Sequence, residues 1–313
     1  MWQFVLRRML YAVPILLGVS VIIFALMQLA PGDVTDMLIP PEASKEVADA
    51  LRAKLGLDRP VYQQYLIWLA NLVQGDLGVS VFTNRPVAEE LRSALLNTLR
   101  LAMPAACIGF TLGVALGTLA GFFHGRWPDK VFSAMAITGV SLPHYWVGIV
   151  LVAIFAVILN LLPAQGMGPE GFPSSWAHIQ HLILPVATLS LIPMGVVSRL
   201  VRASVLEILG LEFVGTLRVK GLRRRRIVWH VMKNAAPTTL AIMGLQFGYL
   251  LGGSILVETV FNWPGSGNLM NLAIFRRDVP VLSATILVLA TIFVVLNILV
   301  DVLQALIDPR IRR

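Results

Sequence analysis

The chain has 313 residues, of which 57% are hydrophobic and only 13% are charged. Soluble globular proteins carry about 25% charged residues, so a water-soluble globular class is excluded, because most of this surface cannot face water. The formal net charge of +8 also needs an explanation, and the positions of the basic residues along the chain supply it.

Six uncharged apolar runs follow one another along the chain, each long enough to cross the roughly 30 Å hydrocarbon layer of a bilayer. They predict an all-α, polytopic membrane protein, built as a single transmembrane domain over residues 1–313. The predicted spans cover residues 9–30, 101–123, 131–162, 182–198, 235–257 and 279–300. The fourth span is the shortest, and it contains Pro185 and Pro193, which packed neighbours tolerate inside membranes.

Basic residues are distributed unevenly between the two sides of the membrane. Sixteen of them fall on the side that holds both termini, whereas the short loops 163–181 and 258–278 hold only Arg276 and Arg277. Cytoplasmic loops carry the excess of Lys and Arg in membrane proteins, so both termini are predicted to be cytoplasmic. This asymmetry explains the net charge, and no nucleic-acid partner is needed.

Residues 31–98 form the only long hydrophilic segment, which is predicted to lie on the extracytoplasmic side. Residues 45–55 have helical spacing, and the sequence LGLDRP ends that helix with a glycine and a proline. Residues 62–72 (YQQYLIWLANL) are aromatic and amphipathic, as in a helix that rests at the membrane interface. A helix packed on the outer ends of the spans is the alternative.

Gly109, Gly113, Gly117 and Gly121 are spaced four residues apart in the second predicted span. This spacing places them on one helical face, where a neighbouring helix can approach closely. We therefore assign these glycines to helix packing rather than to substrate binding.

The third predicted span is interrupted near its middle by the sequence Ser141-Leu142-Pro143-His144. A proline beside polar residues at membrane depth predicts a kinked helix that faces a cavity. His144 either lines a translocation path or bonds a backbone carbonyl that the kink exposes. Ser141, His144 and Gln246 of the fifth predicted span are the candidate residues of such a path.

The sequence lacks the motifs of several enzyme classes. It has no G-x-x-x-x-G-K-[ST] phosphate loop, so the chain is predicted not to hydrolyse ATP itself. It has no H-E-x-x-H motif, and the pair His178 and His181 is too sparse to assign a metal site. The G-x-S-x-G nucleophile elbow is also missing. Transport or signalling are the remaining functions for a protein with six spans.

Residues 199–234, between the fourth and fifth predicted spans, form a basic cytoplasmic loop. Residues 212–220 and 222–232 have helical apolar spacing, and Gly221 between them can adopt a left-handed turn. Two short helices that meet at a glycine form a rigid projection, which suits a cleft in a cytoplasmic partner. Arginines 223–226 would pair with carboxylates of that partner or with anionic lipid headgroups.

The segment 212–237 (EFVGTLRVKGLRRRRIVWHVMKNAAP) resembles the EAA motif of ABC importer permeases, in the form carried by the dipeptide, oligopeptide and nickel group. The matching residues are Thr216, Arg218, Lys220, Gly221, Leu222, His230, Asn234 and Ala235. Further blocks along the whole chain resemble the same group, among them MWQFVLRRMLYAVP, LAPGD, GDLGVS, RPVAEEL, RRDVPVL and DPRIRR. The chain departs from the pattern of the group at Gly215 and Leu217, and in the shortened spacings of His230 and Pro237.

This resemblance implies the type I ABC importer permease fold in a bacterial inner membrane, with cytoplasmic coupling helices between the fourth and fifth spans. It implies that two permease subunits, usually different, form the translocation path, together with two ATP-binding subunits and an extracytoplasmic binding protein. The partner subunits would bind ATP and Mg²⁺, and this chain would bind no cofactor. The residues expected to contact the ATP-binding subunits are Glu212, Thr216, Arg218, Lys220, Gly221, Leu222, Arg223 and Arg226.

The group imports dipeptides, longer peptides, glutathione, nickel complexes and other small solutes, and its specificity lies mainly in the binding protein. The blocks GLQFGYLLGGSILVETVFNWPG and GRWPDK favour a peptide substrate, with nickel or another small solute as the alternative. A secondary transporter driven by an ion gradient would need paired carboxylates or related halves, which the sequence lacks. An intramembrane enzyme would need Ser141 and His144 to act together, although they lie three residues apart on one helix.

Overall fold

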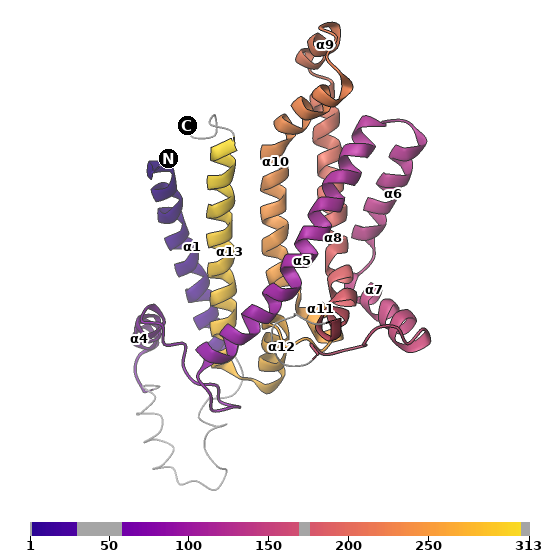
Figure 1. The fold of residues 1–313 in the computed structure, drawn as a ribbon. Helices are drawn as coiled ribbons and strands as arrows, with labels where there is room; N and C mark the ends of the chain where they lie inside the picture. The colour runs from indigo at the N-terminus through magenta and orange to yellow at the C-terminus, as the bar shows by residue number, and fades with distance from the viewer. Residues whose placement is uncertain (1, 30–57, 169–175, 308–313) are drawn as a thin grey trace.

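The computed structural model describes residues 2–29, 58–168 and 176–307, and nearly all of these are helical. Long helices stand side by side and run alternately up and down (Figure 1). The described residues contain no strand beyond an isolated bridge between Val79 and Pro86. The all-α class predicted from the sequence is confirmed.

The helices of the described residues are α1 (Trp2–Leu29), α4 (Val61–Val73), α5 (Val87–Phe122), α6 (Trp127–Ser141), α7 (His144–Leu151) with the π-helical η1 (Val152–Ile158), α8 (Trp176–Leu209), α9 (Glu212–Val219), α10 (Arg224–Gly253), α11 (Ile255–Val260), α12 (Ser266–Arg276) and α13 (Val279–Ile307). Five helical stretches among them are long and apolar enough to cross a membrane: α1, α5, α8, α10 with α11, and α13. The pair of α6 and α7–η1 adds a sixth if it crosses as one bent span.

The long helices extend beyond the apolar runs from which the spans were predicted. α5 has 36 residues and α8 has 34. Each is therefore about 50 Å long at about 1.5 Å per residue, against a hydrocarbon layer of roughly 30 Å. Apolarity marks the part of a helix that lies in lipid, whereas the backbone hydrogen bonds continue past it. Pro104, Pro185 and Pro193 lie inside these two helices without ending them.

The interruption predicted at residues 141–144 is a sharp bend. α6 ends at Ser141 and α7 begins at His144, and the two helical segments differ in direction by 96°. Pro143 lacks the backbone N–H that would continue the α6 hydrogen-bond pattern, which places the break here. The kinked span predicted over 131–162 is thus a bent pair of helical segments that begins at Trp127 and ends at Ile158.

α5 and α8 form the most extensive helix–helix contact in the described structure. The four glycines of the second predicted span all face α8, and a Cβ atom at Gly113 would lie only 2.9 Å from the carbonyl oxygen of Met194. The facing residues are Ser190 and Pro193 for Gly109, Met194 and Val197 for Gly113, Ser198 and Val201 for Gly117, and Val205 for Gly121. A larger side chain would force the helices apart, as at other small-residue contacts between membrane helices.

A second close contact joins α10 to α13, and the sequence analysis did not single it out. A Cβ atom at Gly244 would meet Val300, and one at Gly248 would meet the ring of Phe293. These two glycines are also four residues apart, so the same spacing rule could have found them.

The helices have two distinct ends. α1 begins and α13 ends at the end of the molecule where α9 stands (Figure 1). Arg8 of α1 and Asp301 of α13 form an ion pair at 2.9 Å there. We call this the α9 end. We call the opposite end, where α4, α11 and α12 lie, the α12 end.

α4 lies against the α12 end of α1. The rings of Tyr65 and Trp68 lie 5.4 Å and 5.7 Å from the ring of Phe24, and the hydroxyl groups of Tyr65 and Ser20 are 2.9 Å apart. No residue of α4 is buried. One face of α4 thus packs on α1, as the alternative of a helix packed on the spans predicts, while its other faces are exposed. The other predicted outer helix, residues 45–55, lies outside the described residues.

The structure corrects the prediction for residues 199–234. The sequence predicts a loop that contains a separate short helix over 222–232. Instead, α8 continues to Leu209, and the predicted short helix is the beginning of α10, which runs unbroken through Pro237. The change from charged to apolar residues marks a change of surroundings and not a helix end, since backbone hydrogen bonds do not depend on side-chain polarity.

Candidate functional site

A compact projection stands beyond the long helices at the α9 end (Figure 1). We call residues 210–226 the knob; they contain α9, a turn and the first residues of α10. Gly221 in the turn has a φ of 71°, the left-handed conformation predicted for it. Its amide donates to the carbonyl of Arg218 at 2.9 Å, and the amide of Leu222 donates to that of Leu217 at 3.2 Å. A side chain strains this backbone, so glycine suits the turn.

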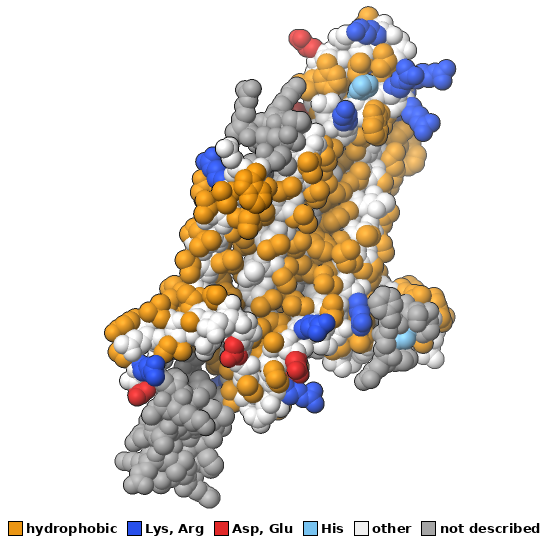
Figure 2. Space-filling view, turned by 60° about the vertical axis from the view of Figure 1, so that its left-hand side comes forward, with side chains coloured by type: hydrophobic (Ala, Val, Ile, Leu, Met, Phe, Trp, Pro, Cys, Tyr) orange, Lys and Arg blue, Asp and Glu red, His pale blue; other side chains and the backbone are white. Residues whose placement is uncertain are grey.

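The knob exposes seven of the eight residues expected to contact the ATP-binding subunits. They are Glu212, Thr216, Arg218, Lys220, Gly221, Arg223 and Arg226, whereas Leu222 is half-buried. Blue side chains gather at this end in Figure 2, beyond the broad apolar belt of the long helices. Within the part of the chain that the structure describes, none of the knob's basic side chains forms an ion pair. The exposed charges of Arg218, Lys220, Arg223 and Arg226 therefore remain available to a partner, whereas the guanidinium of Arg224 lies over the ring of Phe123.

Large apolar side chains stand among these charges, and the sequence analysis did not name them. Val219 at the end of α9 is 90% exposed, Trp229 of α10 is 68% exposed, and Phe213 is exposed as well. All three lie outside the predicted apolar spans, where lipid would not cover them. They are exposed in the part of the molecule that also exposes the basic side chains. An aromatic or branched residue inside a basic segment is the signal that could have found them.

The knob is fixed to the helices below it by a buried apolar cluster. Val214 of α9 is fully buried and packs with Val205 and Ile208 of α8 and with Ile227 and Val231 of α10. Burying one such side chain contributes about 1.5–3 kcal/mol. α9 is thus attached to both helices by packing as well as by the chain, and the three form one unit.

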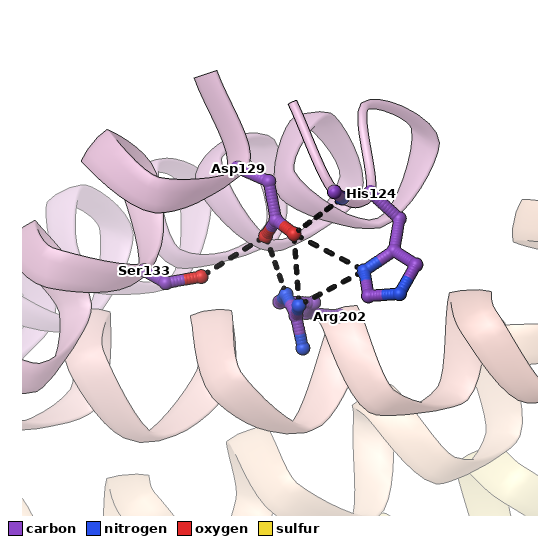
Figure 3. A network of polar contacts seen from close by, with 5 residues as sticks. His124, Asp129, Ser133 and Arg202 are labelled. Carbon is purple, nitrogen blue, oxygen red and sulfur yellow. Dashed lines mark hydrogen bonds and ion pairs between the residues drawn. The ribbon is translucent and has the colours of Figure 1, made fainter. Parts of the chain in front are cut away.

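A polar network lies between α8 and the α5–α6 turn (Figure 3). Asp129 in the first turn of α6 is 5% exposed, and both of its oxygens accept from Arg202 of α8, at 2.7 Å from Nε and 2.9 Å from Nη2. The hydroxyl of Ser133 and the amide of Gly125 each donate to the carboxylate at 3.1 Å, and His124 Nδ1 lies 3.1 Å from it. Two-pronged charge-assisted hydrogen bonds are strong and geometrically specific.

The local sequence does not reveal this network. By its position in the sequence, Arg202 is only one of the many basic residues of the predicted cytoplasmic side, and Asp129 has no predicted role. An isolated carboxylate between basic residues, as in the block GRWPDK, was the available signal. Nothing in the sequence identifies which of many arginines pairs with it.

The three candidate path residues do not meet at one point. A small cavity at the bend is lined by His144, Leu189, Ile192, Tyr249 and Leu250. Gln246 lies one turn before Tyr249 and Leu250 on α10, on the same helical face. Its side-chain Oε1 is buried without a hydrogen-bond partner among the described residues. Ser141 is exposed at the end of α6 and does not line this cavity.

A fully buried carboxylate organises the α12 end. Glu258 of α11 accepts hydrogen bonds from the hydroxyls of Thr98 and Ser254, both at 2.8 Å, and from the amide of Asn268 at 3.0 Å. These bonds join α5, α11 and α12. No lysine or arginine of the described residues forms an ion pair with it. A buried carboxylate is costly unless it is hydrogen-bonded, and here hydrogen bonds take the place of a cation.

An open cleft of about 410 Å³ lies at the same end, between the start of α5 and α12. Its walls include Arg85, Glu89, Asn268 and Arg276. The volume falls in the range of small-molecule sites, roughly 300–1,000 Å³. The described structure thus has an open hollow with both polar and apolar walls at the end opposite to the knob.

Family models assign the chain from its sequence. Residues 113–313 match the model of the binding-protein-dependent transport system inner membrane component, and residues 1–102 match the N-terminal model of the same membrane component. The chain belongs to this family. It is therefore an ABC importer permease and a multi-pass protein of the inner membrane, as the resemblance of residues 212–237 implied.

Curated relatives match the permease from end to end. It is 40% identical over 313 residues to the glutathione transport system permease protein GsiC of Escherichia coli strain K12, covering 100% of the permease and 99% of the relative. Proteins of the same name from Shigella dysenteriae serotype 1 and Shigella boydii serotype 4 are 40% and 39% identical, with the same coverage. The family predicted from the sequence is confirmed.

A solved structure supports the fold. The permease aligns with a chain of the MetNI methionine ABC transporter in an inward-facing conformation, with a TM-score of 0.59 and 16% identity. The alignment covers 71% of the permease and 98% of that chain. At this identity the likeness shows the fold alone, and it confirms the predicted permease fold. Family membership decides against the gradient-driven transporter and the intramembrane enzyme.

Proposed function

We propose that this permease forms, with a second and different permease subunit, the translocation path of an ATP-driven importer of short, glutathione-like peptides. The observation that carries the substrate class is the end-to-end identity of 40% to permeases named for glutathione transport. Nickel or another small solute is the alternative within the same group, and the experiment below separates the two.

The α9 end is the cytoplasmic side in this proposal. The described chain begins and ends there, and the knob with its run of arginines stands there too (Figure 1). A concentration of basic residues on one side is typical of the cytoplasmic side. The α12 end with its open cleft then faces outward, where an extracytoplasmic binding protein delivers the substrate.

Two ATP-binding subunits would dock on the knobs of the two permeases. The exposed charges of Arg218, Lys220 and Arg223 suit carboxylates at the rim of such a contact, while Phe213 and Val219 suit its apolar centre. Rim charges mainly orient and accelerate association, and buried apolar anchors supply affinity. ATP and Mg²⁺ would be bound by these partner subunits and not by this chain.

The knobs would transmit the movement of the ATP-binding subunits to the translocation path. ATP binding would draw the two ATP-binding subunits together and open the path outward through the knobs, and hydrolysis would return it inward. A ligand shifts a conformational equilibrium only by its differential affinity for the two states. The knob surface must therefore fit the closed ATP-binding pair differently from the open pair.

The path would pass the bend between α6 and α7. The cavity beside His144 lies there, and the unpaired Oε1 of Gln246 lies one turn away along α10. An amide oxygen accepts hydrogen bonds from the N–H groups that peptides carry. Membrane lipid would cover the exposed apolar faces of the outer helices α1 and α13.

Reconstitution of the complete importer tests the proposal. Gentle purification from the native membrane, followed by mass spectrometry, should recover a second permease and ATP-binding subunits in stoichiometric amounts. With its binding protein in proteoliposomes, the complex should take up labelled glutathione or a labelled dipeptide in an ATP-dependent manner. If the complex takes up nickel but neither glutathione nor the dipeptide, the substrate is nickel and the peptide assignment is wrong. Recovery of this permease alone, with its neighbours fully expressed, would overturn the assembly.

A further inference from the structure

We propose that the ion pair between Asp129 and Arg202 is a positioning device that makes α6 move together with the knob. The inference rests on the proposed function, because the knob is displaced only if ATP-binding subunits act on it. Asp129 and Arg202 are positioning residues in this account, since neither lines the cavity at the bend nor lies in the knob.

The first step leads from the knob to Arg202. Arg202 lies two turns before the end of α8 at Leu209, and Val205 and Ile208 stand between them. Both of these residues pack with Val214 of the knob in one buried cluster. A close-packed interior transmits displacement rather than absorbing it, so the end of α8 must follow α9.

The second step leads from Arg202 to α6. The guanidinium holds both oxygens of Asp129, and its Nη2 also lies 3.2 Å from His124 Nδ1 in the α5–α6 turn (Figure 3). Two parallel hydrogen bonds fix orientation as well as distance. Ser133 and Gly125 hold the same carboxylate from the α6 side. The pair therefore joins α8 to both ends of the turn that precedes α6.

A second contact joins the α5–α6 turn to α10, the helix that follows the knob in the chain. The guanidinium carbon of Arg224, the first residue of α10, lies 5.4 Å from the centre of the Phe123 ring. A cation over an aromatic face is attracted to it at this distance. Phe123 directly precedes His124, so the α5–α6 turn contacts both α8, which leads into the knob, and α10, which follows it.

The third step leads along α6 to the bend. α6 packs closely on α8, since a Cβ atom at Gly139 would lie 3.0 Å from the carbonyl oxygen of Leu191. α6 is an unbroken helix of 15 residues from the network to Ser141, and His144 beyond the bend lines the cavity. A rigid helix held at the network thus carries a displacement of the knob to the candidate path.

The experiment measures substrate uptake and ATP hydrolysis together in the reconstituted importer. Asp129→Asn removes the charge that Arg202 holds, and ATP hydrolysis should persist while uptake per ATP falls by about 2- to 30-fold. That range matches the effect of substitutions within coupling networks, on the order of 0.5–2 kcal/mol.

The matched control is Asp301→Asn. It makes the same chemical change at the same end of the molecule, where it breaks the ion pair between Arg8 of α1 and Asp301 of α13. Neither helix belongs to the chain of contacts from the knob to the bend, so uptake per ATP should stay at the value of the unsubstituted importer.

A distance measurement separates coupling from simple stability. Spin labels at the exposed residues Glu207 of α8 and Lys130 of α6, in a permease with Cys107→Ser, report the separation of the two helices. With and without a non-hydrolysable ATP analogue, the distance should stay constant in the parent complex, because the helices move as one body. In the Asp129→Asn complex it should change or broaden when the analogue binds.

The outcomes are distinct. No ATP-driven uptake by the unsubstituted complex would defeat the proposed function. With uptake intact, an unchanged ratio in Asp129→Asn, or an equal loss of uptake and hydrolysis with a constant distance, would overturn the inference. If Asp129→Asn fails to assemble, Arg202→Lys decides, since it keeps the charge but not the two-pronged geometry. A lowered ratio in Arg202→Lys supports the inference, and a normal ratio overturns it.

Discussion

Replacing Gly221 by alanine probes the knob with the smallest change available. Gly221 has a φ of 71°, and a Cβ atom there would meet nothing within 4 Å. The cost is therefore backbone strain alone, about 1–2 kcal/mol for a residue forced into the left-handed region. If the alanine turn relaxes in the free permease and docking restores the left-handed conformation, the affinity for the ATP-binding subunits falls by about 5- to 30-fold. The affinity of Gly221→Val should be lower still, because β-branched residues tolerate the left-handed region least.

Gly215→Ala is the matched control. Gly215 lies inside α9, and a Cβ atom there also meets nothing within 4 Å. The same chemical change should strengthen the helix by about 0.8–1 kcal/mol, because alanine is the better helix former. The assay is a titration of the permease in lipid nanodiscs with the purified ATP-binding subunits. Unchanged affinity in both Gly221 variants, or an equal loss in Gly215→Ala, would refute the role of the turn.

Three further predictions concern the rest of the permease. Glu258→Ala removes the acceptor of three buried hydrogen bonds, from Thr98, Ser254 and Asn268, and should cost at least about 1–3 kcal/mol of stability, measured as a lower thermal midpoint. Glu258→Gln should lie between it and the parent, and an unchanged midpoint in Glu258→Ala would contradict the role of Glu258 in joining α5, α11 and α12. Gly117→Leu should lower the midpoint strongly, because a Cβ atom there already meets Ser198 and Val201, whereas Gly18→Leu, with nothing within 4 Å, should not. Gln246→Leu removes a buried unpaired oxygen, so the free energy of unfolding should stay the same or rise by up to about 1–3 kcal/mol, while peptide uptake slows. Uptake at the rate of the parent would contradict a place for Gln246 in the path.

Features that depend on neighbouring residues could be predicted from the sequence. The glycine spacing in α5 placed four residues on one face, because the period of a helix is a property of the backbone alone. The left-handed turn at Gly221 and the break before His144 follow from the φ preferences of glycine and the missing N–H of proline. The magnitude of the bend, 96°, did not follow, because it depends on how α6 packs on α5 and α8 and how α7 packs on α8 and α11.

The sequence by itself determined the class of protein, the approximate spans, the uneven charge and the basic projection with its glycine turn. Each of these comes from composition or from spacing within one helix or one turn. Only the tertiary structure decided which charges pair and which polar groups are buried together. Asp129 meets Arg202 across 73 residues, and Glu258 meets Thr98 across 160. Such contacts depend on how separate helices pack, and no local pattern encodes the partner of a single side chain.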